Sequence, residues 1–430
     1  MRRAIVVILD GLRRDFVTPT LTPRLAAFRD SAEWFATHRS VAPSVTRVAS
    51  SSVATGSYPG AHGIEGNALA LTEKGRLRLH DVGRPEFFPH RRCVTGRALD
   101  RPTMAERLAE QGGTVVYSNV SPGAAYAHDP DGHGHVFHRA GSYGPGRTPL
   151  PPLPIKGNID GDRFMTERFL ETVLSDRAPV YGLIWMSEPD TCQHALPLGS
   201  HEHLEILRAA DANAGRVIDA IRRLRDHDDV LLAVGSDHGH QTVTDVVDVA
   251  GELDRLGFSD ARAAGDLVVA PNGTAALIYA SARGRDRVPA LAERLANETW
   301  AGDVVTPDSL AEIGHDAARG LALYVSMAAS DAENTHGVPG LSHAVKPLAG
   351  KSDRLGCGQH GGLGRYEQSP FLMIEGDGFR AGATRTDPTS LVDLAPTILA
   401  HLDLPSGGMS GRALSRPPQE RPHTERTHDA

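Results

Sequence analysis

The sequence is short of cysteine, of long apolar stretches and of basic runs, and each shortage excludes a class of protein. Its three cysteines, Cys93, Cys192 and Cys357, stand alone without a CxxC pair, which argues against a disulfide framework and a cysteine zinc site. No run of about 18 apolar residues exists, so no transmembrane helix is expected. The apolar run after Met1 ends at Asp10 without a small-residue cleavage site, so no signal peptide is expected. These absences predict a cytoplasmic protein without a membrane partner.

The charge distribution argues against nucleic acid as a partner. The net charge is −8 and no long basic run occurs. An acidic average is still compatible with an anionic substrate if bound metal ions supply positive charge locally. The length of 430 residues suffices for one large α/β domain with an insertion, or for two domains. The sequence carries no signal for an oligomeric state.

Continuous apolar runs alternate with helical patterns along most of the chain. Such runs are typical of strands buried on both faces of a parallel sheet. The expected strands span 4–9, 114–117, 180–185, 229–235 and 370–374, and the expected helices span 22–37, 47–55, 104–111, 162–174, 201–225 and 390–403. The pattern predicts an α/β fold with a mostly parallel central sheet sandwiched by helices.

Changes in composition suggest where the chain divides. Residues 1–250 together with 346–405 are expected to form the catalytic α/β domain, and 251–345 a small α+β insertion or cap. Residues 406–430 are expected to be a disordered tail, because periodicity disappears by about Arg416. The segment 127–154 is rich in Gly, Pro and His and is expected to be a long irregular loop. Its four histidines are candidates for binding metal or substrate, with a solvated loop as the favoured alternative: His128, His133, His135 and His138.

Thr46 is the candidate nucleophile. Pro43 and Ser44 stop the preceding segment and Gly56 ends the helix that follows, so Thr46 is expected at a helix N-terminus. Free N–H groups and the positive end of the helix dipole favour an alkoxide or a bound oxyanion there. The simpler alternative for a threonine at this position is an N-cap.

Carboxylates and imidazoles follow three of the predicted strands. Because ligand crevices in open α/β sheets lie beyond the carboxyl ends of the strands, these side chains are expected to converge. The candidates are Asp10, Asp190, His194, Asp237 and His238, with His360 added from a turn before the last strand. Mixed Asp and His ligation suits zinc, and six ligands suggest two ions that could serve a displacement at phosphorus. Metal binding to Thr46 would then make its alkoxide accessible.

In this order the residues resemble the alkaline phosphatase superfamily. The chain most resembles its type I phosphodiesterase/nucleotide pyrophosphatase branch, to which phosphonoacetate hydrolase is also similar. The supporting strings are ILDGLRRD, ATGSYPGAHGIEGN, EPDTCQH, SDHGH, GQHGG and VDLAPTILAHLDLP, which are spread over residues 4–405.

The resemblance implies a two-metal hydrolase of phosphate esters that acts through a phospho-threonine intermediate on Thr46. It implies two Zn²⁺ ions, which another divalent metal could replace, and a small phosphorylated or phosphonate substrate. One ion would be held by Asp190, His194 and His360, and the other by Asp10, Thr46, Asp237 and His238. The separate magnesium site of the phosphatases proper has no evident ligand set in this sequence.

One departure leaves the substrate open. The resemblance leads us to expect an amide donor in the helix after the nucleophile, but that position holds Ala49, followed by Ser50. Arg47 is a candidate to bind a phosphate dianion or a carboxylate, and Ser50 is a second candidate substrate ligand. The alternatives to a diesterase are a phosphomonoesterase and a hydrolase of the phosphonate C–P bond, for which Lys346 or Lys351 would bind the substrate carboxylate. A non-catalytic zinc-binding scaffold is the remaining alternative.

Overall fold

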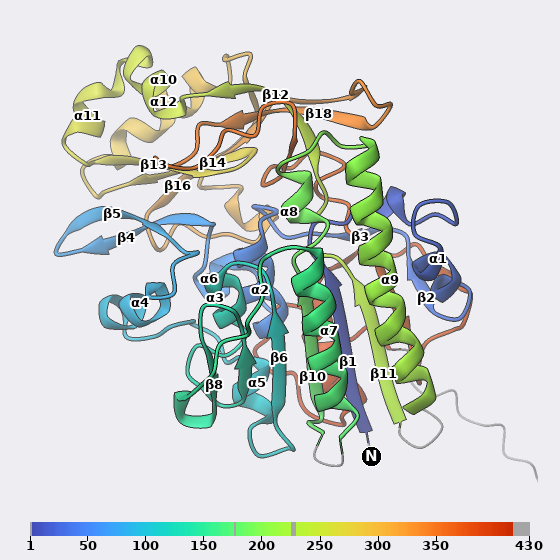
Figure 1. Cartoon of the computed structure of the whole chain (residues 1–430). Coiled ribbons are helices and arrows are strands. Elements are labelled where there is room, and N and C mark those ends of the chain that lie inside the picture. The colour runs from blue at the N-terminus through green and yellow to red at the C-terminus, as the bar shows by residue number, and fades with distance from the viewer. Residues whose placement is uncertain (1, 176–177, 225–228, 416–430) are drawn as a thin grey trace, which may run out of the picture.

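A ten-stranded sheet forms the centre of the larger part of the molecule (Figure 1). It belongs to a computed structural model that describes residues 2–175, 178–224 and 229–415. The strand order is β21-β2-β20-β11-β1-β10-β6-β7-β8-β9, and the five strands from β11 to β7 run parallel. These five are β11 (Asp229–Gly235), β1 (Arg2–Leu9), β10 (Tyr181–Met186), β6 (Thr114–Ser118) and β7 (His135–Phe137). The predicted α/β class with a mostly parallel sheet is confirmed.

Helices cover both faces of this sheet because the side chains of β1 are buried on both sides. Ile5 and Val7 pack with one group of helices and Val6 and Ile8 with the other. The first group lies in front of the sheet in Figure 1 and comprises α1 (Pro23–Arg29), α7 (Ile159–Val173) and α9 (His201–Leu224). The second comprises α2 (Thr46–Thr55), α5 (Met104–Leu108), α6 (Pro122–Ala127) and α13 (Leu394–His401).

Three segments differ from the sequence-based expectation. The helix expected over 22–37 ends at Arg29, and Glu33–Phe35 instead form strand β2, where Trp34 and Phe35 suit a buried strand. The irregular loop expected over 127–154 contributes strands β7, β8 (Ser142–Gly144) and β9 (Thr148–Leu150), each too short to show an alternating pattern. The weak strand signals of the polar stretch before residue 100 correspond to a hairpin of β4 (Ala68–Glu73) and β5 (Arg76–Asp81), and the difference there is helix α4 (Phe87–Thr95), which was not expected.

A smaller part of the molecule lies beyond the carboxyl ends of the parallel strands, at the top of Figure 1. It has a core of its own, built around a four-stranded sheet in the order β13-β14-β16-β15. A second four-stranded sheet, β17-β18-β12-β19, adjoins it. The main elements are β12 (Gln241–Val247), α10 (Val249–Leu253), α11 (Ser259–Ala263), β13 (Leu267–Asn272), β14 (Ala275–Ala280), α12 (Val288–Leu295), β15 (Ala301–Val305), β16 (Leu321–Met327), β17 (Ala329–Glu333), β18 (Pro339–Val345) and β19 (Gly358–Gln359).

The end of the chain returns to the main sheet. Strand β20 (Leu372–Glu375) runs antiparallel to β11, and the helix expected over 390–403 is a 3₁₀ turn, η6 (Leu391–Asp393), continued by α13. Residues 406–415 are not the disordered tail we expected, because the backbone N–H groups of Ser410 and Gly411 donate to Gly56 and Leu414 is buried. The rest of that prediction, 416–430, lies outside the described residues. Among the described helices, none is long and apolar enough to cross a membrane.

Candidate functional site

Three neighbouring strands bring the predicted carboxylates to one edge of the sheet. Asp10 follows β1 directly, Asp237 comes two residues after β11, and Asp190 begins the short helix α8 (Asp190–Gln193) after β10. Because β1 lies between β10 and β11, the side chain of Asp10 lies between the other two. The topological reasoning from strand ends therefore placed these residues correctly.

Thr46 is the first residue of α2. The preceding residue, Val45, is extended, so the helix begins at the candidate nucleophile. The Thr46 hydroxyl oxygen lies 3.2 Å from His238 Nε2 and 3.5 Å from Asp10 Oδ1. The side chain lines the cavity described below. It is thus not a simple N-cap, since its hydroxyl is directed at the cluster of acidic and imidazole groups.

Asp10, Asp237 and His238 form the first cluster. His238 Nε2 lies 3.4 Å from Asp10 Oδ1 and 3.2 Å from Asp237 Oδ2. All three are buried, and Asp237 Oδ2 has no hydrogen-bond partner among the described residues. Burial, reinforced by the charge of Asp237, raises the pKa of Asp10, and burial raises the pKa of Asp237 to about 7. Two buried carboxylates so close together need a cation if both are to be ionised.

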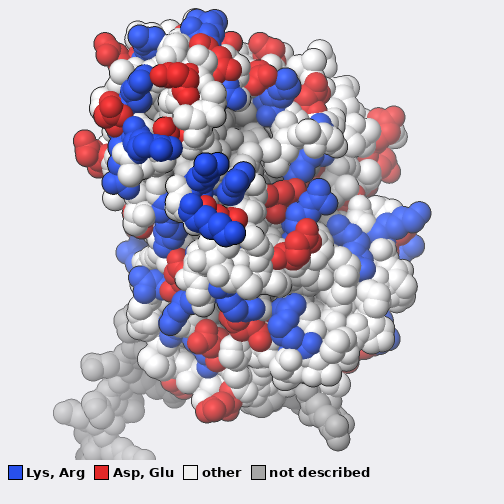
Figure 2. Space-filling model, turned by 90° about the vertical axis from the view of Figure 1, so that its left-hand side faces the viewer, with Lys and Arg blue, Asp and Glu red and all other residues white. Residues whose placement is uncertain are grey.

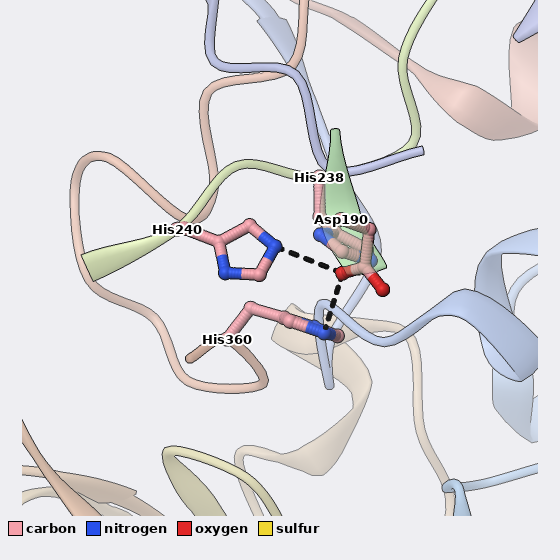
Figure 3. A group of neighbouring side chains, drawn as sticks. All are labelled: Asp190, His238, His240 and His360. Carbon is pink, nitrogen blue, oxygen red and sulfur yellow. Dashed lines mark hydrogen bonds and ion pairs between the residues drawn. The ribbon is translucent and has the colours of Figure 1, made fainter. Parts of the chain in front are cut away.

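Asp190 is the centre of the second cluster. His194 Nε2 and His360 Nε2 each lie 3.4 Å from Asp190 Oδ1, and His240 Nε2 lies 2.8 Å from the same oxygen. Figure 3 shows the rings of His240 and His360 both directed at this carboxylate, with His238 beside it. Burial opposes ionisation of Asp190, but attraction to His194 and the hydrogen bonds from His240 and His360 outweigh it and lower its pKa.

The three predicted histidines share one orientation. Each has Nδ1 within hydrogen-bond distance of a backbone carbonyl oxygen: His194 with Gly358 at 2.9 Å, His360 with Ser44 at 2.7 Å and His238 with Gly239 at 3.1 Å. When Nδ1 donates and a metal ion takes the place of the proton on Nε2, each ring would offer the Nε2 lone pair to that ion. This arrangement is the usual one for metal-ligating histidine, so the donor set fits divalent metal ions.

His240 was not among the predicted site residues. It is fully buried, its Nδ1 has no partner among the described residues, and its Nε2 faces Asp190. The tautomer that satisfies Asp190 carries the proton on Nε2, which distinguishes His240 from the other three rings. A Cβ atom on Gly11 or Gly358 would lie 2.7 or 2.8 Å from this ring, so both glycines make room for it. The sequence signal was the second histidine of the SDHGH string.

A cavity of about 600 Å³ opens onto both clusters. Its wall contains Asp10, Thr46, Asp190, His194 and His360 of the predicted residues, whereas Asp237 and His238 lie behind it. Basic side chains line it as well, namely Arg47, Arg139, Lys351 and Arg354. None of the described residues in its wall is Phe, Tyr or Trp. The cavity therefore combines acidic and imidazole groups at its base with positive charge around them.

Arg47 is held beside the clusters. Its Nε donates to Ser121 Oγ at 3.1 Å, and a Cβ on Gly83 would lie 2.4 Å from its guanidinium. Burial lowers the pKa of Arg47, and attraction to Asp81, Asp190 and Asp10 opposes that shift. The guanidinium thus faces the site, and its ordinary pKa lies so high that it stays charged.

Ser50, the other candidate substrate ligand, does not reach the cavity. It is fully buried and its hydroxyl has no partner among the described residues. It lies about one helical turn after Thr46, about 6 Å further along the axis, and is not among the residues that line the cavity. Ala49 is buried in the core, so an amide at that position would not meet a substrate either.

Asn67 supplies an amide at the cavity, the group that the resemblance led us to expect at position 49. It lines the cavity, and its Oδ1 accepts a hydrogen bond of 3.2 Å from the backbone N–H of Arg47. No hydrogen bond of its Nδ2 occurs within the described part of the chain, so that group is available to a ligand. Asn67 closes the turn-rich IEGN string, whose approach to Thr46 depends on tertiary structure and was not visible in sequence.

The smaller part of the molecule contacts the site through the turn between β13 and β14. Asn272 bonds to both backbone groups of Ala68, and the backbone N–H of Thr274 donates to His360. Gly273 has φ of +71°, and a Cβ there would lie 1.9 Å from the His360 carbonyl oxygen. This turn thus supports the backbone of a predicted metal ligand.

The histidines of the segment 127–154 are outside the site. His138 is fully buried, with Nε2 2.9 Å from the Val120 carbonyl oxygen, and His128 is buried against the ring of Trp185. His133 and His135 are exposed. The expectation of a solvated loop therefore holds for two of the four histidines only.

Comparisons with known proteins agree with this geometry. The family model of type I phosphodiesterase / nucleotide pyrophosphatase matches residues 4–309. Murine ectonucleotide pyrophosphatase / phosphodiesterase 5, solved as an inactive variant with AMP, superposes with a TM-score of 0.66 at 18% identity over 96% of this chain and 97% of its own. Human ectonucleotide pyrophosphatase / phosphodiesterase 5 superposes with a TM-score of 0.65 at 15% identity, over 95% of this chain and 97% of its own.

A phosphonate hydrolase has the same fold. Phosphonoacetate hydrolase from Sinorhizobium meliloti 1021, in complex with phosphonoformate, superposes with a TM-score of 0.66 at 18% identity over 93% of this chain and 95% of its own. No match was found among curated proteins. At these identities the structural matches establish the fold.

Proposed function

Because the chain belongs to the type I phosphodiesterase/nucleotide pyrophosphatase family, we propose that it hydrolyses a phosphoric ester at two metal ions with Thr46 as nucleophile. The observation that carries this proposal is the position of the Thr46 hydroxyl, 3.2 Å from His238 and 3.5 Å from Asp10, at the first turn of α2. An N-cap threonine would need only a hydrogen bond to the backbone of its own helix, so the N-cap alternative does not account for these two neighbours.

The residues fall into two sets that suit one ion each. Asp190, His194 and His360 would hold the first ion, and Asp10, Thr46, Asp237 and His238 the second, with zinc the ion that best suits these donors. Two such ions would favour ionisation of the hydroxyl and neutralise the phosphoryl oxygens. His240 would hold Asp190 in position by donating from Nε2 to its Oδ1.

The reaction has two displacements. In the first, Thr46 Oγ1 loses its proton to solvent and forms a bond to phosphorus, and the leaving oxygen departs with its electron pair and takes up a proton. In the second, water bonds to phosphorus, the bond from phosphorus to Oγ1 breaks, and Oγ1 regains a proton. The Asn67 amide Nδ2 and those N–H groups of the first turn of α2 that are not paired, unlike the N–H of Arg47, would bind the phosphoryl oxygens.

The test is replacement of the nucleophile. Thr46→Ala should lower turnover of an aryl nucleotide diester by about 10³-fold or more, and Thr46→Ser should retain measurable turnover. Acid quenching of wild type during turnover should yield phosphorylated Thr46 by peptide mass spectrometry. Thr55→Ala, at the far end of the same helix, is the control and should leave turnover unchanged. Undiminished turnover in Thr46→Ala would remove Thr46 from the mechanism.

The cavity lining favours a second candidate, a substrate with an anionic group beyond its scissile phosphoryl group. Arg47, Arg139 and Lys351 surround the site with positive charge, and no aromatic side chain among the described lining residues is placed to stack on a nucleobase. A phosphomonoester or a phosphonate bearing a carboxylate would suit such a cavity better than a nucleotide.

The two lysines expected to bind a carboxylate offer a matched pair for testing this. Lys351 lines the cavity and pairs with Asp81 at 2.7 Å, whereas Lys346 pairs with Asp248 at 2.8 Å outside it. Lys351→Met should raise the KM for phosphonoacetate several-fold and leave the diester KM unchanged, and Lys346→Met should change neither. Equal effects of the two substitutions would contradict this subsite. A higher kcat/KM for the diester than for an aryl phosphomonoester or phosphonoacetate would favour the diesterase.

A further inference from the structure

A further cluster of His and Glu side chains, which are residue types that can bind a metal ion, lies outside the cavity. Glu73 ends strand β4, His80 lies in β5, and His90 lies in α4. These elements project from the left of Figure 1, and that side faces the viewer in Figure 2, where basic and acidic side chains are interspersed. The sequence-based reasoning had assigned no role to any of the three residues.

The three side chains converge on one point. His80 Nε2 lies 2.6 Å and His90 Nε2 2.8 Å from the same oxygen, Glu73 Oε1. The two ring centroids are 4.8 Å apart and the rings are tilted by 35°. All three ligand atoms lie within 4.8 Å of one another. Two imidazoles from different elements therefore direct the same ring nitrogen at one carboxylate oxygen.

This convergence is what a metal ion requires. Without a metal, both rings must carry a proton on Nε2 to satisfy one oxygen. With a metal, the two nitrogens and the carboxylate supply a His₂Glu donor set, which is a familiar set for zinc with an open fourth position. We propose that Glu73, His80 and His90 bind a divalent transition metal ion such as Zn²⁺, separate from the ions of the catalytic site.

The surroundings allow an ion to enter. The side chains of Glu73, His80 and His90 are 25%, 23% and 41% exposed, so an ion would need little displacement of protein to reach them. Cys93 follows His90 by three residues on α4 and lines the same surface hollow as both histidines. A thiolate one helical turn away is a candidate for the fourth position.

A metal ion here would join the hairpin to α4 beside the cavity. His80 precedes Asp81, which bonds to Lys351 of the cavity wall and to the backbone N–H of Gly83. Gly83 in turn packs against the guanidinium of Arg47. The inferred role is structural, because none of the three ligands lines the cavity itself.

The experiment measures zinc bound to the full chain. Bound metal is removed from the purified protein with a chelator, and the protein is dialysed against micromolar Zn²⁺. The number of zinc ions bound per chain is then measured by inductively coupled plasma mass spectrometry. His80→Gln/His90→Gln should bind one zinc fewer per chain than wild type while keeping diester turnover at saturating zinc. His133→Gln/His135→Gln, which removes two exposed histidines elsewhere, should bind as much zinc as wild type. Equal zinc content in all three proteins would overturn the proposal.

A direct measurement covers the case in which the double variant fails to fold. A crystal of the wild-type protein with Zn²⁺ should show an anomalous peak about 2.0–2.2 Å from the two Nε2 atoms and the carboxylate. If Cys93→Ser also binds one zinc fewer per chain than wild type, the Cys93 thiolate is the fourth ligand of this ion. The absence of an anomalous peak at this position, in a crystal that shows zinc at the catalytic site, would also overturn the proposal. Because zinc at the two sites is counted separately, failure here leaves the proposed catalytic function untouched.

Discussion

His240 distinguishes this site at the scale of single residues. It is the buried imidazole nearest to Asp190, at 2.8 Å, and its orientation differs from that of the other three histidines. We expect His240→Asn to lower the affinity of the Asp190 cluster for zinc by about 10- to 100-fold, because it removes the donor that orients a ligand carboxylate.

Zinc titration of diester turnover measures this effect. Saturating zinc should restore most of the kcat in His240→Asn, which separates a positioning role from a catalytic one. His203→Asn removes another buried histidine, in α9, and should leave the zinc dependence as in wild type. A large fall in kcat that zinc does not restore would indicate that His240 contacts the reacting groups.

Residue-level prediction succeeded where chain position alone decides the geometry. Asp10, Asp190 and Asp237 were predictable because a residue after a parallel strand must lie at the sheet edge. Asn67 and His240 were not predictable, because their contacts with the Arg47 backbone and with Asp190 depend on how loops pack over that edge. Ser50 was predicted as a substrate ligand because it is close to Thr46 in sequence. The structure instead buries it within the helix, away from the residues that line the cavity.

At the scale of elements, the β13–β14 turn links the smaller part of the molecule to His360, a proposed metal ligand. Gly273→Ala should lower diester turnover by about 10²-fold, because a Cβ 1.9 Å from the His360 carbonyl oxygen must displace a ligand. Gly75→Ala is the matched control, since Gly75 also has a positive φ, +76°, but nothing lies within 4 Å of its Cβ.

Turnover and thermal unfolding of the two variants give the comparison. Gly75→Ala should lose only the conformational cost of about 1–2 kcal/mol that a left-handed alanine incurs, and keep its activity. If both variants lose stability equally and both keep full turnover, the turn does not position His360.

Elements were predictable when they were long and periodic. Strands β1, β6, β10 and β11 of the parallel sheet and helices α7 and α9 were found within a few residues of their observed bounds, whereas the three-residue parallel strand β7 was missed. The errors fell on short strands at the sheet edges, such as β2 and β8, which are three residues long and held by pairing with distant segments. Tertiary pairing decides such segments, and a local pattern contains no information about it.

At the scale of the whole molecule, Glu65 lies buried between the two parts. Its Oε2 accepts a hydrogen bond of 2.9 Å from Tyr279 of β14, and its Oε1, which has no hydrogen bond among the described residues, lies 3.7 Å from Arg319 Nη1, whose charge opposes the effect of burial. Burial raises the pKa of Glu65 to about 7. The folded protein therefore retains a proton at pH values where the unfolded chain, with a pKa near 4.3, has lost it.

The sign of the pH dependence follows. Between about pH 4.3 and 7 the folded state binds more protons at Glu65, so its contribution to stability falls as pH rises and is fully lost above pH 7. Glu65→Gln should gain stability relative to wild type across this range, by at most about 4 kcal/mol. Urea unfolding from pH 5 to 8.5 measures the difference. Glu312→Gln, at an exposed position, should run parallel to wild type, and a parallel curve for Glu65→Gln would contradict the assignment.

The order of the proposed ligands along the chain bears on the biosynthesis of this enzyme. Asp10 leaves the ribosome early, but His360 follows 350 residues later and then accepts a hydrogen bond from the turn between β13 and β14. A nascent chain would thus remain without hydrolytic activity until more than four fifths of it has been translated. A truncated product that ends before this point would lack a proposed metal ligand and should therefore be unable to hydrolyse phosphate esters.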